Sequence, residues 1–198
     1  IHTAGARVFG PLHEQVDYSI EYAKQAGKYD QAEDIDITGD LLDARLTFKA
    51  PTDTLWSPSV MLEYVSFSGD DPSSVDEDEG WDPIFAAYPI FREELLPVMN
   101  RGDWTNMDMY RVEGRAKVNA CWSFATAYAY VAADYGDETL RGMGGQGDSM
   151  GHLVSVFVDY KPVKWLSFAL EVAEFFPSSY WDDGDNSTWG RFQTIITY

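Results

Sequence analysis

Apolar and polar residues alternate with a period of two along most of the chain. The run 122–130 shows the pattern best, because bulky residues such as Trp122, Phe124 and Tyr128 alternate with small ones. A period of two is typical of a β-strand, whose successive side chains point to opposite faces. The pattern predicts nine strands, at about residues 3–9, 16–23, 42–49, 59–64, 109–118, 122–130, 154–160, 166–173 and 191–198.

Strands with one apolar and one polar face fit two architectures. In a soluble β-sandwich or a lipocalin-like barrel the apolar face points inward, whereas in a transmembrane barrel it points outward to lipid. The polar face is heavily charged here, and this favours the transmembrane barrel because its lumen is wet. That face carries seven basic and seven acidic residues: Arg7, Asp17, Glu21, Asp43, Arg45, Lys49, Glu63, Arg111, Glu113, Arg115, Lys117, Asp159, Glu171 and Arg191.

The connections between the strands alternate between short and long. Short ones lie near residues 11–15, 50–57, 119–121 and 161–164, and long acidic ones lie near 24–36, 68–106, 132–151 and 177–188. Short turns at one rim and long loops at the other are typical of outer-membrane barrels. Such barrels also carry aromatic girdles at both membrane interfaces, and aromatic residues lie near the strand ends: Tyr22, Tyr64, Trp122, Tyr160, Trp165, Trp189 and Tyr198. We therefore predict an all-β, antiparallel transmembrane β-barrel.

The number of strands predicts that more of the barrel exists. Bacterial single-chain barrels normally have an even number of strands, with both chain ends on the periplasmic side. Here a short turn at Pro11 follows the first strand, so the chain begins on the long-loop side. Nine strands alone would leave two unpaired edges in lipid, where backbone groups must be paired. We expect the chain to be the C-terminal part of a larger barrel.

Composition argues against several other classes of protein. The net charge of −19 disfavours binding to nucleic acid. The longest uncharged stretch, 118–133, has 16 residues, fewer than the roughly 20 that a membrane-spanning helix needs. Cys121 is the single cysteine, so the chain cannot form an internal disulfide, and no Cys/His spacing indicates zinc. No metal site and no cofactor are expected.

The chain resembles the alginate-export family of outer-membrane porins. The resemblance rests on the runs VDYSIEYAKQAGKYD (16–30), SVMLEYVSFSGDDPSS (59–74), EGWDPIFAAYP (79–89), GHLVSVFVDYKPVKWLSFALEVAEFFP (151–177) and RFQTIITY (191–198). It covers most of the chain and implies an eighteen-stranded barrel in the outer membrane of a Gram-negative bacterium. Residues 1–198 would then form one domain, the C-terminal half of that barrel. The closing aromatic residue is similar to the ends of substrates of the barrel-assembly machinery.

The same resemblance implies a path for solutes. Members of the family guide an anionic polysaccharide through a lumen rich in arginine, and guanidinium groups pair well with carboxylates. By strand position, the implied path is lined by Arg45, Arg111, Arg115 and Arg191, with Lys49 and Lys117 deeper toward the short-turn rim. The equal number of acids leaves a second interpretation open, in which cross-strand ion pairs simply line a wet lumen.

The long connection 68–106 contains two contrasting stretches. Six acids fall within residues 70–79, which indicates either a solvated loop or a weak site for a divalent cation. Residues 81–97 are apolar and aromatic, which is unusual for an exposed loop. We predict that they fold over or into the barrel mouth and narrow it, although a loop–loop contact or a subunit interface would explain them equally. The constriction would be formed by Trp81, Asp82, Phe85, Tyr88 and Phe91.

These features predict an outer-membrane porin or channel for small or oligomeric anionic solutes. Its expected partners are outer-membrane lipid, lipopolysaccharide, the barrel-assembly machinery and the solute. One alternative is a scaffold barrel that docks or sheathes a periplasmic partner, such as a multihaem cytochrome or a secretion component. Another is a soluble β-sandwich binding module. Enzyme activity is not expected, because His152 beside Ser149 is the only candidate for the histidine and nucleophile that such catalysis needs.

Overall fold

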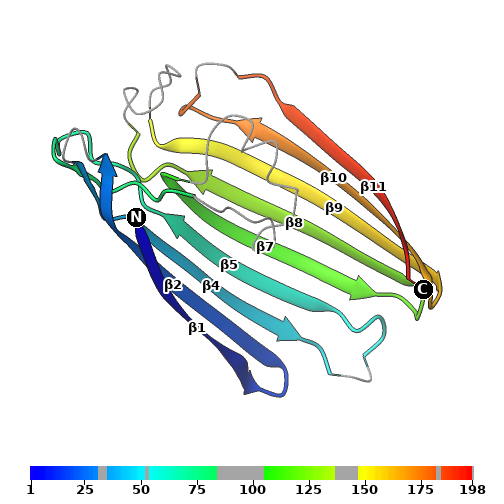
Figure 1. Ribbon diagram of the computed structural model, residues 1–198. Helices are drawn as coiled ribbons and strands as arrows, with labels where there is room; N and C mark the ends of the chain where they lie inside the picture. The colour runs from blue at the N-terminus through cyan, green and yellow to red at the C-terminus, as the bar shows by residue number, and fades with distance from the viewer. Residues whose placement is uncertain (31–34, 52–53, 84–104, 137–146, 182–183, 198) are drawn as a thin grey trace.

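Nine long strands lie side by side in one curved antiparallel sheet (Figure 1). The computed structural model describes residues 1–30, 35–51, 54–83, 105–136, 147–181 and 184–197. The nine predicted strands and the all-β class are confirmed, and two short strands are added. The eleven strands are β1 (His2–His13), β2 (Val16–Asp30), β3 (Ile35–Ile37), β4 (Asp40–Lys49), β5 (Ser59–Phe67), β6 (Glu77–Asp78), β7 (Met107–Lys117), β8 (Trp122–Ala132), β9 (Ser149–Val163), β10 (Leu166–Pro177) and β11 (Ser187–Ile196).

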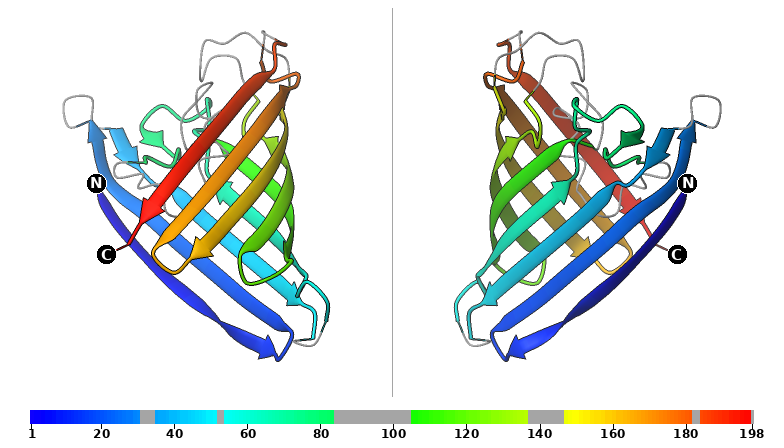
Figure 2. Two further views of the ribbon diagram at one scale, coloured as in Figure 1. Left: turned by 90° about the vertical axis from the view of Figure 1, so that its right-hand side faces the viewer. Right: turned by 90° about the vertical axis from the view of Figure 1, so that its left-hand side faces the viewer.

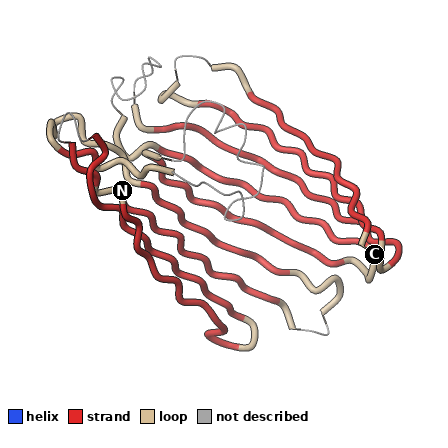
Figure 3. Tube along the Cα trace, viewed as in Figure 1, coloured by secondary structure: helices blue, strands red, loops and turns tan. Residues whose placement is uncertain are grey.

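The two short strands lie at the long-loop rim. β3 pairs with the far end of β2, and β6 pairs with β3 in parallel. Both fall inside predicted loops, 24–36 and 68–106, because neither is long enough to show an alternation. In the trace of the described residues only strands and loops are drawn (Figure 3). No helix in these residues is long and apolar enough to cross a membrane.

β2 is longer than the sequence predicts. The strand continues to Asp30, because residues 24–26 pair with β1, as Ala26 does with His2, and residues 27–30 pair with β3. β9 also begins early, at Ser149 within the expected loop 132–151. Polar residues and glycines at these positions end the hydrophobic alternation, but the neighbouring strand still satisfies their backbone hydrogen bonds. The alternation therefore marks the stretch that faces lipid rather than the whole strand.

The two faces of the sheet differ as predicted. On the outward face Val156 is 48% exposed and Leu170 is 44% exposed, and Leu42 and Leu46 are half-buried. Arg45 and Arg115 lie on the opposite, concave face, beside buried acids of β4, β5 and β7. Apolar side chains therefore point away from the concave face at mid-strand, which is the arrangement of a membrane barrel.

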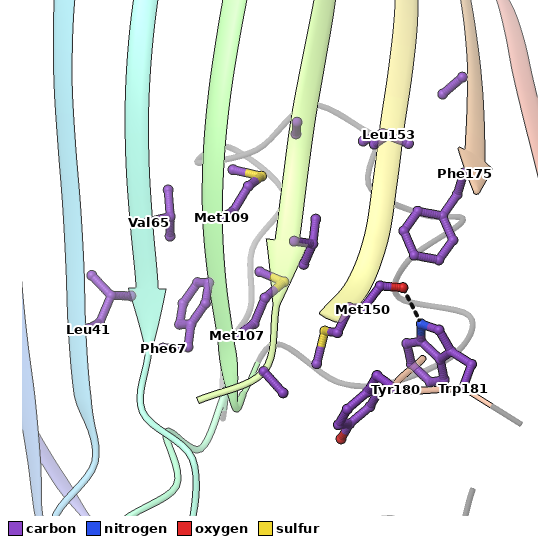
Figure 4. Packing of buried hydrophobic residues seen from close by; sticks show 14 residues of the cluster. Leu41, Val65, Phe67, Met107, Met109, Met150, Leu153, Phe175, Tyr180 and Trp181 are labelled. Carbon is purple, nitrogen blue, oxygen red and sulfur yellow. Dashed lines mark hydrogen bonds between the residues drawn. The ribbon is translucent and has the colours of Figure 1, made fainter. Parts of the chain in front are cut away.

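The concave face is not polar along its whole length. Toward the long-loop rim it carries a packed apolar cluster (Figure 4), in which Val65 and Met109 are completely buried. The sequence analysis named the charged residues of the inner face and did not identify this apolar section. These residues share the face of the lumen charges, but they are covered by side chains such as Trp81 rather than by water. The cluster comprises Leu41, Val65, Phe67, Met107, Met109, Ala129, Val131, Ala133, Met150, Leu153, Ala173, Phe175, Tyr180 and Trp181.

Aromatic residues form two rows across the outward face. One row runs through Tyr64, Tyr110, Tyr130 and His152, whose ring centroids are 5.0, 6.4 and 5.4 Å apart in turn. The other joins Trp122 to Tyr160 at 4.2 Å, and continues to Phe168 and Phe192 at 6.2 and 6.0 Å. The first row is near the long-loop rim and the second is near the short turns, as expected of two interfacial girdles.

Trp189 was expected in such a girdle but belongs to the inner face. Its cross-strand partner is the buried Ala173, and its ring packs against the apolar cluster. The guanidinium of Arg191 lies 6.0 Å from the centre of this ring. A tryptophan near a strand end therefore faces whichever side its position in the alternation dictates.

The sheet curls strongly, with its strands inclined across it (Figure 2). β1 and β11 form its two edges in the part of the chain described. Each edge carries backbone N–H and C=O groups on one side that need partners in lipid. The sheet is thus an open section of a barrel wall.

Candidate functional site

Charged side chains cross the inner wall in one connected band. The register of β4, β5 and β7 places opposite charges side by side, because Glu63 is the cross-strand partner of both Arg45 and Arg111. We call this band the ionic belt. Its members are three acids and three bases, so its formal charge is zero: Asp43, Arg45, Glu63, Arg111, Glu113 and Arg115.

Each carboxylate in the centre of the belt bridges two arginines. Glu63 accepts from Arg45 Nε at 2.6 Å and from Arg111 Nη1 at 3.1 Å. Glu113 accepts from Arg111 Nη2 at 2.6 Å through one oxygen and from Arg115 Nη2 at 2.8 Å through the other. Such charge-assisted contacts hold both partners in fixed positions.

The belt is buried at its centre and is most open at Arg115. The side chains of Glu63 and Arg111 are only 4% and 6% exposed, whereas that of Arg115 is 36% exposed. At the other end Arg45 Nη2 donates to Asp43 at 2.6 Å. A buried charge is stable only when paired, so the central residues depend on one another. Arg115 is the member that can most readily reach a solute.

A column of small residues on β8 accompanies the belt. Ala125, Ala127 and Ala129 lie directly opposite Arg115, Glu113 and Arg111 in the register, and all three alanines are buried. Small side chains leave room for long charged ones to lie along the wall. The alternation of β8 was recognised in the sequence, but the pairing of its alanines with the belt depends on a register that a single sequence does not specify.

The other expected lumen residues lie apart from the belt. Arg191 donates to Glu171 at 3.0 Å on β10 and β11, and Lys49 contacts Asp17 at 2.6 Å near the short turns. Lys117 is exposed at the end of β7. The structure therefore brings Arg45, Arg111 and Arg115 together and places the remaining three elsewhere on the inner wall. Whether any of them contacts a solute stays a prediction.

The connection that follows β5 returns to the inner wall at Trp81 and Asp82. The Trp81 ring is 6.3 Å from that of Phe67, and it packs on the apolar cluster. The backbone of Asp82 is bound by Gln25 of β2. Two of the expected constriction residues, Trp81 and Asp82, thus have inner-wall contacts, whereas Phe85, Tyr88 and Phe91 fall outside the described residues. A narrowed pore stays a prediction.

Acidic groups crowd together within this segment. The Asp70 carboxyl accepts from the backbone N–H of Glu79 at 3.3 Å, and Glu79 accepts from the Ser74 hydroxyl at 2.9 Å. Burial, followed by the nearby charge of Asp78 and the contact with Glu79, raises the pKa of Asp70 to about 6. By contrast, donation from the Ser73 backbone lowers the pKa of Asp71.

The raised pKa predicts that residues 68–82 are held more firmly at pH 5 than at pH 7. The folded segment keeps a proton that the released segment loses between pH 3.8 and about 6, so its stability falls as the pH rises through this window. We expect slower hydrogen exchange of this segment at pH 5, after correction for intrinsic rates. Asp70→Asn should give similar protection at pH 7 and reduce the pH dependence, of which Asp78 retains a part because burial raises its pKa as well.

Asp71→Asn is the matched control for this experiment. Its carboxylate is favoured in the charged form by Ser73, so neutralising it should not protect the segment at pH 7. Equal protection by both variants would mean that general loss of negative charge, rather than the position of Asp70, is responsible.

Other candidate chemistry is limited. Among the residues that the structure describes, no group of three or more His, Cys, Asp or Glu is arranged to hold a metal ion. His152 Nδ1 lies 2.8 Å from the Tyr128 hydroxyl on the outward face, within the row of aromatics near the long-loop rim. Its position there is that of a residue at the membrane interface.

The architecture is similar to that of a solved outer-membrane protein. The crystal structure of the outer membrane protein OprD from Pseudomonas aeruginosa matches with a TM-score of 0.60 at 14% sequence identity, over 98% of this chain and 50% of OprD. The fold is that of an outer-membrane porin barrel. The chain spans half the length of OprD, in agreement with an open section of wall. No family model and no curated protein matches the sequence.

Proposed function

We propose that the chain forms about half of the wall of an outer-membrane channel for hydrophilic solutes. The observation that carries this proposal is the division of the sheet into an apolar outward face and an inner wall crossed by the ionic belt. A charged band on the inside of a barrel favours solutes that can exchange hydration water for polar contacts. The fold shared with OprD supports the same compartment and the same class of protein.

The solutes proposed for this channel are small or oligomeric anions, as in alginate export. The belt itself is neutral, so it gives no overall preference for either sign of charge. Support for anions comes from its open end, where Arg115 and the exposed Lys117 follow each other on the inner face of β7. Guanidinium and ammonium groups at this depth would bind carboxylates passing toward the short-turn rim.

The outward face supports the proposed lipid partners. The two aromatic rows would lie at the two interfaces of the bilayer, with the row of Tyr64, Tyr110 and Tyr130 on the side of lipopolysaccharide. An outer-membrane barrel of this kind would be inserted by the barrel-assembly machinery.

Planar-bilayer recording of the complete protein tests this proposal. We expect discrete conductance steps in KCl, and a reversal potential in a KCl gradient that indicates preference for chloride. Arg115→Gln combined with Lys117→Gln should shift the reversal potential toward potassium, because both substitutions remove positive charge from the lumen. Gln193→Leu, on the inner face of β11, is a neutral control.

Two outcomes would contradict the proposal. Absence of any conductance would exclude a channel, and copurification of a stoichiometric partner would then favour the scaffold barrel. Preference for potassium in the unmodified protein would exclude the anionic solutes and leave the channel itself intact.

A further inference from the structure

Gln25 of β2 holds the Trp81–Asp82 backbone against the inner wall. Its side-chain Nε2 donates to the carbonyl of Asp82 at 2.6 Å, and its Oε1 accepts from the N–H of the same residue at 2.8 Å. The side chain is 2% exposed, although most lumen residues are open to water in such barrels. A primary amide is suited to this contact because it donates and accepts at the same time.

Ser68, which follows β5, binds the backbone of the same segment through both its carbonyl and its hydroxyl. Its carbonyl accepts from the N–H of Trp81 and from the N–H of Asn106, both at 3.0 Å. Its hydroxyl donates to the carbonyl of Glu79 at 2.6 Å and accepts from the N–H of Asp40 at 2.8 Å. The backbone on both sides of the long connection is therefore bound at one residue at the end of β5.

A second amide repeats the arrangement just before β7. Asn106, which is 3% exposed, donates to the carbonyl of Tyr135 at 2.9 Å and accepts from its N–H at 2.7 Å. Thus each of two buried amides binds both backbone groups of one loop residue. One of them fixes residue 82 to β2, and the other fixes residue 135 beside the start of β7.

The contact of the segment with the wall is close. A Cβ atom at Gly39 would lie 2.8 Å from the Gly80 oxygen and 2.9 Å from the Trp81 Cα. A Cβ atom at Gly69 would lie 2.3 Å from the Asn106 Oδ1. Glycine at these two positions lets the backbones approach, so that the amides can reach them.

We propose that Gln25 is a positioning residue that sets the solute size limit by holding Trp81 and Asp82 inside the lumen. This inference rests on the proposed function as a channel. Trp81 packs against the apolar cluster and directly precedes Asp82 in the chain. Its own N–H is bound by the Ser68 carbonyl, so loss of the Gln25 contact frees the tryptophan on its Asp82 side, where the segment enters the lumen. Gln25 itself is buried beneath this backbone and need not touch a solute.

Gln25→Leu in the complete protein tests the proposal. Leucine fills a similar volume but leaves both backbone groups of Asp82 without their partners, and this should shift the equilibrium toward the released segment by roughly 5- to 150-fold. We expect a larger unitary conductance in KCl, and faster swelling of proteoliposomes in sucrose and raffinose. Gln193→Leu is the matched control and should leave both measurements unchanged.

Gln25→Glu provides a readout that a merely structural role would not change. Ionised glutamate can accept from the Asp82 N–H but cannot donate to its carbonyl, whereas protonated glutamate can do both. The Glu variant should therefore conduct like the Leu variant at pH 8 and approach the unmodified protein at pH 5. The unmodified protein at both pH values corrects for the titration of Asp70.

Hydrogen exchange of the Asp82 N–H separates this inference from the proposed function. In detergent this N–H should be protected in the unmodified protein and should exchange rapidly in Gln25→Leu, whether or not the protein conducts. Fast exchange without any conductance would exclude the channel function but support the role of Gln25 in holding Asp82. Unchanged protection, or unchanged conductance and swelling in a variant with normal heat-modifiable mobility, would overturn the role of Gln25.

Discussion

Leu170→Arg should destabilise the complete barrel by about 1–2 kcal/mol, between the costs at the interface and at the midplane, whereas Ala169→Arg should cost far less. The two residues are neighbours on β10 and differ in the face that they present. Leu170 points outward and is 44% exposed, next to Phe192 of the aromatic row near the short turns, so arginine at that position would enter the hydrocarbon on that side of the membrane. Ala169 points inward, and its cross-strand partners are Asp159 and Gln193.

Reversible unfolding in lipid vesicles measures this difference. The inward arginine should find a carboxylate and water, and so it should leave the free energy of unfolding nearly unchanged. Equal losses at the two positions would mean that strand disruption, rather than lipid, causes the effect. A greater loss at Ala169 would reverse the assignment of the two faces.

Glu63→Gln should cost about 3–5 kcal/mol, because it removes the shared partner of the buried Arg111 and the partly exposed Arg45. Arg45 and Arg111 would keep their contacts with Asp43 and Glu113, but the belt would carry one uncompensated positive charge. The same charge should raise the preference of the channel for anions. Unfolding in vesicles and the reversal potential in a KCl gradient measure the two effects.

Two further variants show whether the unpaired charge causes the loss of stability in Glu63→Gln. Glu171→Gln breaks only the separate pair with Arg191, whose side chain is 30% exposed, and should cost less. Adding Arg111→Met to Glu63→Gln restores a neutral belt in which Asp43 keeps Arg45 and Glu113 keeps Arg115, and it should recover part of the lost stability. If Glu63→Gln is as stable as the unmodified protein, the belt does not depend on its charge balance.

The sequence predicted the strands and the faces well, for a physical reason. Lipid on one side requires an apolar residue at every second position, and this requirement repeats in each strand. Strand ends were less predictable, because residues such as Lys24 and Gln25 pair with a neighbour without facing hydrocarbon. The apolar cluster on the inner wall was not predicted, since its members depend on a covering segment that alternation does not describe.

The charged residues of the candidate site could be predicted from the sequence, but the ion pairs between them could not. Arg111 and Glu113 were recognised as inner-face charges, and cross-strand pairing was one of two interpretations. The register decides that Glu63 lies between Arg45 and Arg111, and a single sequence does not contain the register. Gln25 and Asn106 gave no signal, because a buried amide that binds a loop resembles any polar lumen residue until the loop is placed.

The unpaired borders of β1 and β11 have a practical consequence for anyone producing this polypeptide. Each border is a template on which another copy of the chain can add a strand, so the polypeptide expressed alone should aggregate in detergent. These borders are also the edges at which the further strands proposed for the barrel would pair. Co-expression of this chain with strands that close the proposed barrel should convert the aggregates into a discrete, heat-modifiable species on gels.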